Sequence, residues 1–85
     1  MSFLSILTTI AGTGMALGYF TQTYKILKRK SAEDVSILTY LIFGIGVTIW
    51  LIYGISINNS PIIITNIISV IGAFSVIISY FLHRH

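Results

Sequence analysis

The chain has 85 residues, of which 55% are hydrophobic and only 8% are charged, and its mean hydropathy is +0.95. Its Asp, Glu, Lys and Arg side chains all lie between Lys25 and Asp34 or at Arg84, which excludes an ordinary soluble domain with charges spread over its surface. The net charge of +3 comes from one basic cluster beside an apolar segment, so we expect a lipid bilayer as partner and no nucleic acid.

The uncharged segments are long enough for three membrane spans. A span needs about 20 mostly apolar residues, because the hydrocarbon core is about 30 Å thick and a helix rises about 1.5 Å per residue. We predict one transmembrane domain over residues 1–85, with spans at about 3–27, 36–57 and 61–82. The first span has no basic segment before it and is too long for the apolar core of a signal peptide, so we expect it to stay attached.

Capping residues indicate where the second and third helices begin. Ser31 followed by Asp34 suits the start of the second helix, since a carboxylate there complements free N–H groups. Ser60 before Pro61 is typical of a cap followed by a proline in the first helical turn, so residues 58–60 are expected to form a turn. The apolar runs are continuous rather than alternating, which favours an all-α membrane bundle over a β-barrel.

The basic residues predict the orientation of the spans. Lysine and arginine occur in the first loop, residues 28–35, and after the third span, but not before the first span or in the 58–60 turn. Because cytoplasmic flanks are enriched in these residues, we expect the N-terminus outside and the C-terminus inside. The loop at 28–35 is then cytoplasmic and the turn at 58–60 extracellular.

Three helices enclose little polar volume, so a solute pathway needs walls from a second copy of the chain. A homodimer is therefore the minimal prediction. Gly14 and Gly18 are spaced to let two helices approach closely, either within one protomer or between two, and the sequence leaves both readings open.

Ionisable side chains are absent from the second and third spans, and the first has only Lys25 near its end. Coupled pumps and proton relays normally need such a group within the membrane, so passive movement of an uncharged solute is favoured. The sequence also has no nucleophile–base pair, metal-ligand cluster or phosphate loop, so we expect no enzyme activity, no cofactor and no metal.

Two side chains within the spans suggest a solute site. Trp50 lies about 10 Å from the outer end of the second span, and Asn66 lies about 7 to 8 Å from the outer end of the third, so their depths are similar. Phe43, Trp50 and Ile57 share one helix face with Tyr53. Sugars suit such a site, because an indole packs on their C–H faces and an amide both donates to and accepts from hydroxyls. The alternatives are an aromatic anchor or core packing for Trp50, and an interhelical hydrogen bond for Asn66.

Several motifs together resemble one known family. They are Thr21-Gln22 followed by Lys25 and Lys28, the loop KSAEDVS at residues 30–36, and Trp50-x-x-Tyr53-Gly54 followed by Asn66. The chain resembles the SemiSWEETs, half-size bacterial relatives of the SWEET sugar transporters in the PQ-loop (MtN3/saliva) superfamily. The resemblance implies a parallel homodimer of three-helix bundles in the inner membrane of a bacterium, with helix order 1-3-2. It also implies a sugar on the dimer axis and alternating access.

The resemblance also assigns roles to residues. Trp50 and Asn66 would contact the sugar, and Tyr53 would belong to the extracellular gate. The intracellular gate would comprise Tyr19, Gln22 and Phe43.

The chain departs from the family pattern at two places. Thr21-Gln22 replaces the Pro-Gln pair, so the hinge would rest on Gly18 or on Thr21, whose hydroxyl can bend a helix by bonding a carbonyl one turn earlier. Ile57 and Asn59 replace an arginine and an aspartate of the outer gate, so closure would rest on Tyr53, Ile57 and neutral hydrogen bonds.

Three functions are consistent with the sequence. The leading hypothesis is facilitative, uncoupled transport of a mono- or disaccharide. The second is transport of another small neutral or zwitterionic solute on the same fold. The third is a holin-like or assembly-type membrane protein that has no solute site.

Overall fold

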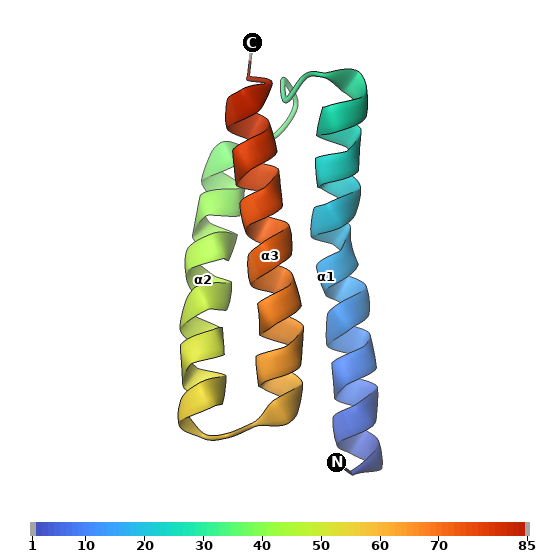
Figure 1. The fold of residues 1–85 in the computed structure, drawn as a ribbon, viewed down its shortest axis with the longest axis vertical. Helices are drawn as coiled ribbons and strands as arrows, with labels where there is room; N and C mark the ends of the chain where they lie inside the picture. Colours follow the sequence, from blue (N-terminus) through green and yellow to red (C-terminus); the bar gives the residue numbers. More distant parts are fainter. Residues whose placement is uncertain (1, 85) are drawn as a thin grey trace.

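The computed structural model describes residues 2–84 and contains three α-helices: α1 (Phe3–Arg29), α2 (Ile37–Ser56) and α3 (Ser60–Leu82). Each helix is long and apolar enough to cross a membrane, which confirms the predicted all-α, three-span fold. Figure 1 shows α3 between the other two helices. The backbones of α1 and α2 each pack against α3 and not against each other, so the order across the bundle is 1-3-2.

The two ends of the bundle differ in charge. The loop at residues 30–36 and the C-terminal end of α3 lie together at one end, and the start of α1 lies beside the α2–α3 turn at the other (Figure 1). We call the first the basic end, because Lys25, Lys28, Arg29, Lys30 and Arg84 lie in or next to it. We call the second the turn end.

The start of α2 differs from the prediction. Its N-cap is Ser36, whose side chain accepts a hydrogen bond from the backbone N–H of Thr39, rather than a residue of the Ser31–Asp34 segment. Asp34 instead pairs with Arg29 at 3.2 Å, and the backbone N–H of Ala32 donates to the carbonyl of His83 at 3.0 Å. The Ser31–Asp34 segment is therefore part of an irregular loop that is tied to the end of α3.

The cap of α3 also differs from the prediction. Asn59, rather than Ser60, is the N-cap, and its side-chain oxygen accepts from the backbone N–H of Ile62 at 3.1 Å. The backbone N–H of Asn59 bonds the carbonyl of Gly54 at 2.9 Å. Asn59 therefore bonds a carbonyl of the last turn of α2 through its amide and caps α3 through its side chain, which allows a very short turn, and Pro61 lies in the first turn of α3 as expected.

Three glycines allow α3 to pack closely on its neighbours. A Cβ atom on Gly72 would lie 2.6 Å from Cβ of Tyr19, one on Gly12 would lie 2.6 Å from Cγ2 of Thr65, and one on Gly54 would lie 2.5 Å from Cγ2 of Ile62. By contrast, a Cβ on Gly14 or Gly18 would meet nothing within 4 Å. Close packing within the protomer therefore does not explain the Gly14/Gly18 pair.

Buried residues fix the part of α1 nearest the basic end to α3. Ile26 and Val76 are the largest fully buried side chains, and Ala32 of the loop packs beside them. The hydroxyls of Thr23 and Ser75 are 2.7 Å apart and form a hydrogen bond between α1 and α3. These contacts hold α1 against α3 and leave its other side open toward α2.

Candidate solute site

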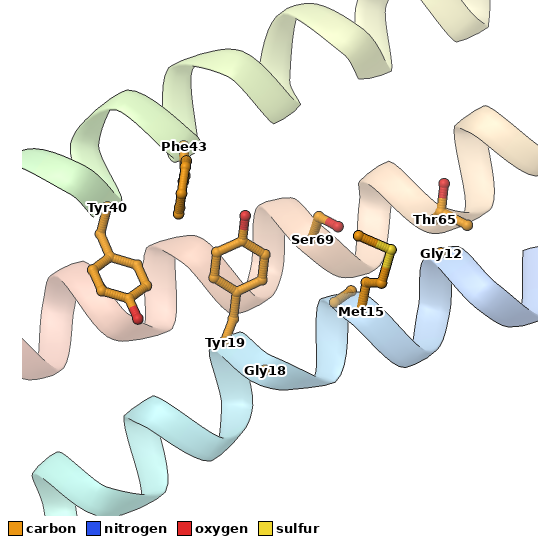
Figure 2. Close-up of a pocket in the computed structure, with 9 residues that line it drawn as sticks. Gly12, Met15, Gly18, Tyr19, Tyr40, Phe43, Thr65 and Ser69 are labelled. Atoms are coloured by element: carbon orange, nitrogen blue, oxygen red, sulfur yellow. The ribbon is translucent and has the colours of Figure 1, made fainter.

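An open groove of about 510 Å³ lies between α1 and α2, with α3 as its floor. Met15 and Tyr19 line it from α1, and Thr65 and Ser69 line it from α3 (Figure 2). Gly12, Ala16 and Gly18 complete the α1 wall without side-chain bulk, and Tyr40 and Phe43 form the α2 wall. The groove exists because α1 and α2 are separated by the whole width of α3. We call it the front groove.

Three aromatic rings narrow the front groove toward the basic end. Tyr19, Tyr40 and Phe43 contact one another edge to face, with ring centroids 6.1 to 6.3 Å apart. Tyr19 extends from α1 toward the two α2 rings, so side chains bridge helices whose backbones do not touch (Figure 2). Edge-to-face contacts of this kind are weak enough to break and re-form, at about 0.5 to 1.5 kcal/mol each.

Tyr40 is a member of this cluster that the sequence analysis does not predict. Tyr40 precedes Phe43 by one helical turn, so the spacing would have placed both on one face of α2. Gln22, expected beside Tyr19 and Phe43, is half-buried one turn farther along α1 and is not among the residues that line the front groove.

Trp50 lies outside the core of the protomer. Its side chain is 56% exposed and contacts Tyr53 edge to face, with ring centroids 5.6 Å apart. It lies two turns beyond Phe43 on the same face of α2, toward the turn end, and does not itself line the front groove. Core packing within the protomer therefore does not account for this indole.

Asn66 lies on α3 between Thr65 and Ser69, is half-buried, and is not itself among the residues that line the front groove. Its side-chain N–H donates to the carbonyl of Ile62 in its own helix at 2.8 Å. Within residues 2–84 it forms no hydrogen bond to another helix, so a bond between helices of one chain does not account for this residue. A carboxamide has two donors and an accepting oxygen, so it retains hydrogen-bonding capacity for a further partner.

The residues expected at the outer gate lie at the turn end. The backbone N–H of Ile57 bonds the carbonyl of Tyr53 at 3.1 Å, and the side chain of Ile57 is exposed. The side chain of Asn59 caps α3 through its oxygen, so that oxygen is already paired. Tyr53 contacts Trp50, which places an aromatic residue of this end directly beside the indole.

The expected hinge positions lie in an unbroken helix. α1 is continuous from Phe3 to Arg29, and the hydroxyl of Thr21 donates to the carbonyl of Leu17 at 3.2 Å, the contact predicted for this threonine. Gly18 has open space around it and lines the front groove. A side-chain hydroxyl that shares a helix carbonyl can bend a helix, but Thr8, Thr9 and Thr23 of α1 make the same kind of bond, so the hinge at Gly18 and Thr21 stays a prediction.

Known proteins show the same fold. A crystal structure of a bacterial homologue of SWEET transporters matches with a TM-score of 0.87 and 35% sequence identity, over 94% of this chain and 96% of that one. A SemiSWEET sugar transporter of Bradyrhizobium diazoefficiens is 32% identical over 68 residues, which are 80% of this chain and 79% of that protein. An uncharacterized protein of Methanocaldococcus jannaschii is 39% identical over 66 residues, 78% of this chain and 71% of that protein.

A family model extends the similarity to nearly the whole chain. The model described as "Sugar efflux transporter for intercellular exchange" (MtN3_slv) matches residues 2–85. This is a family of transporters rather than enzymes, as the sequence predicts. The three apolar helices and these relatives make the chain a multi-pass membrane protein, and a bacterial inner membrane fits the SemiSWEET relatives. The chain therefore belongs to the MtN3_slv family of sugar transporters and is of the SemiSWEET type.

Proposed function

We propose that the protein is a facilitative, uncoupled transporter of a mono- or disaccharide that works by alternating access as a parallel homodimer. The observation that carries this proposal is the front groove, which a single protomer leaves open along its length. A second copy related by a two-fold axis parallel to the helices would place another such groove opposite the first. The two grooves together would enclose a pathway on the dimer axis.

The exposed residues beside the front groove support the dimer. Met15 is 82% exposed and Trp50 56% exposed, and the Gly14/Gly18 face of α1 meets no other helix of the protomer. Small residues permit close helix contact in lipid, where packing rather than apolar burial drives association. We assign the Gly14/Gly18 face to contact with the second copy.

The sugar would contact Trp50 and Asn66 from both protomers. The exposed indole offers an apolar face to the C–H side of a sugar ring, and the carboxamide offers donors and an acceptor to its hydroxyls. Neither contact requires a charged solute. Two copies of each side chain, related by the dimer axis, would hold one ring from two sides.

The two ends of the pathway would close in turn. At the turn end, which we place outside the cell, Tyr53, Ile57 and Asn59 would form the gate. At the basic end, which we place in the cytoplasm, Tyr19, Gln22 and Phe43 would form the gate together with Tyr40. Bending of α1 at Gly18 and Thr21 would move Tyr19 away from the two α2 rings and open the basic end.

Counterflow in proteoliposomes tests the transport proposal. We expect wild-type protein to exchange radiolabelled glucose or sucrose, and Asn66→Ala to lower the exchange at least about tenfold, because a sugar hydroxyl loses its partner in a water-poor site. Thr9→Ala is the matched control, since the Thr9 hydroxyl also bonds its own helix, at Ser5, but Thr9 is not one of the proposed sugar contacts. Native mass spectrometry verifies that each variant is dimeric.

The alternatives predict other results in the same assay. Exchange of amino acids without exchange of either sugar would replace the sugar by another neutral or zwitterionic solute. A protein without a solute site would exchange nothing, and Asn66→Ala would then change only helix packing or stability.

We expect the net sugar flux to be independent of a proton gradient. α2 and α3 contain no Asp, Glu, His, Lys or Arg, and the carboxylates of Glu33 and Asp34 lie in the exposed loop at the basic end. No side chain within those two helices can therefore carry a proton across at neutral pH. The measurement is sugar uptake into vesicles with and without an imposed difference of one pH unit. Accumulation of sugar above its external concentration, driven by pH, would contradict uncoupled transport.

A further inference from the structure

A second groove, of about 310 Å³, lies between α2 and α3, and we call it the back groove. Leu41, Ile45 and Ile49 line it from α2, and Phe74 and Ile77 line it from α3. The hydroxyl of Thr48, another lining residue, donates to the carbonyl of Gly44 at 2.7 Å and so is already paired. Gly44 also lines the groove and has no side chain to fill it; a Cβ atom at this position would be in ordinary van der Waals contact with Cδ1 of Ile77, at 3.5 Å. The back groove is thus apolar and offers no free polar partner within its walls.

The back groove opens on the opposite side of α2 from the proposed sugar pathway. Leu41, Ile45 and Thr48 lie one turn apart on one face, whereas Phe43 and Trp50 lie on the other, because a helix turns about 100° per residue. The second copy in the proposed dimer covers the face of Trp50. The back groove consequently faces the hydrocarbon of the bilayer.

The length and depth of the back groove match one leaflet of a membrane. The α2 wall from Leu41 to Ile49 is about 12 Å long and starts about 6 Å from the first residue of α2 at the basic end. Half of the hydrocarbon thickness is about 15 Å. An acyl chain that enters from the basic end would therefore follow the groove to about the middle of the bilayer.

A fixed positive charge lies at the basic end of the same α3 face. Phe74, Ile77 and Phe81 are spaced three to four residues apart along this face, and Phe81 is half exposed. The guanidinium of Arg84 lies over the Phe81 ring, 5.4 Å from its centroid. This contact holds a cation at the level where an apolar surface meets the aqueous boundary.

We propose that the back groove and Arg84 form a phospholipid site on the outer surface of each protomer. One acyl chain lies along Leu41, Ile45, Phe74 and Ile77, and the phosphate binds the guanidinium of Arg84. A guanidinium pairs with phosphate oxygens through two parallel hydrogen bonds. Phosphatidylcholine carries a quaternary ammonium beside its phosphate, which the Arg84 cation repels, so the site favours a lipid with net negative charge, such as phosphatidylglycerol.

Native mass spectrometry of the detergent-solubilised full-length dimer tests this site. Delipidated protein is titrated with phosphatidylglycerol and, separately, with phosphatidylcholine. We expect Arg84→Gln to weaken phosphatidylglycerol binding about fivefold and to abolish the preference over phosphatidylcholine, since one basic side chain near the surface contributes about 1 kcal/mol. Lys25→Gln removes one charge from α1 at the same end of the bundle and is expected to retain the preference.

The acyl-chain part of the site has its own variant. Thr48→Trp fills the back groove and is expected to reduce binding of both lipids, whereas Ile52→Trp, one turn farther along α2 and outside the groove, is expected to bind as wild type. Circular dichroism measures the helix content and so identifies a Thr48→Trp protein that fails to fold. In that case the surface variant Arg84→Gln still tests the lipid site.

Three results would overturn the proposal. The first is equal binding of phosphatidylglycerol by wild type, Arg84→Gln and Thr48→Trp. The second is an equal loss of binding in Lys25→Gln and Arg84→Gln, which would indicate general charge attraction. The third is dissociation of the dimer by Thr48→Trp but not by Ile52→Trp, which would make the back groove an interface between copies of the chain.

Discussion

Replacing Trp50 by alanine is expected to weaken sugar binding by about 1 to 3 kcal/mol for each stacked face, which corresponds to about 5-fold to 150-fold in Kd. Trp50 is 56% exposed in the protomer, so the protomer does not depend on the indole for its core. The substitution also removes the edge-to-face contact with Tyr53. Isothermal titration of the purified dimer with glucose or sucrose measures the change directly.

Two matched variants separate stacking from other effects of Trp50→Ala. Trp50→Phe keeps an aromatic face at the same position and should recover part of the affinity. Phe3→Ala removes an exposed aromatic ring at the turn end, outside both grooves, and should bind sugar as wild type does. Unchanged sugar affinity in a folded, dimeric Trp50→Ala protein would remove the indole from the proposed site.

Replacing Gly72 by alanine is expected to lower the free energy of unfolding by about 1 to 3 kcal/mol, the usual cost of added bulk in a packed core. The new methyl group would lie 2.6 Å from Cβ and 3.2 Å from Cγ of Tyr19. The Cβ atom of Tyr19 is attached to the backbone, so rotation of the side chain cannot relieve the clash and α1 must move away from α3. The displacement would also disturb the contacts of Tyr19 with Tyr40 and Phe43.

Gly46→Ala is the control for Gly72→Ala, because a Cβ on Gly46 meets nothing within 4 Å. In α2 this substitution should leave stability unchanged or raise it by up to about 1 kcal/mol, since alanine favours a helix more than glycine does. Unfolding in mixed micelles of increasing dodecyl sulfate content, followed by loss of helical circular dichroism, provides the comparison. Equal stability of the two variants would show that α1 and α3 do not need the close approach at Gly72.

The spacing of glycines along a helix does not decide which neighbouring helix packs against them. Gly14 and Gly18 have the spacing of a close helix contact, yet the contacts between α1 and α3 form at Gly12 and Gly72. A spacing motif identifies a face on which two helices can approach, but not which helix will occupy it. That choice depends on which side of α1 faces α3, which the buried residues Ala16 and Ile26 fix together with the Thr23–Ser75 hydrogen bond.

The sequence predicts those features of the candidate site that depend on the geometry of one helix at a time. The shared face of Phe43 and Trp50, and the similar depths of Trp50 and Asn66, follow from the geometry of single helices. The cluster of Tyr19 with Tyr40 and Phe43 joins residues of two helices that do not pack against each other, and no pattern within either helix reveals it. The sugar roles of Trp50 and Asn66 stay predictions.

The three spans and the all-α fold follow from the hydropathy pattern alone, because the length of an uncharged apolar run is set by the bilayer and not by neighbouring helices. The two grooves and the anchoring of the first loop depend on the packed bundle. The Ala32 amide bonds the carbonyl of His83 at the end of α3, a contact between segments far apart in the sequence, whereas the bonds of Asn59 with Gly54 and Ile62 are local. Side chains from more than one helix line each groove, so no pattern within a single helix predicts either groove.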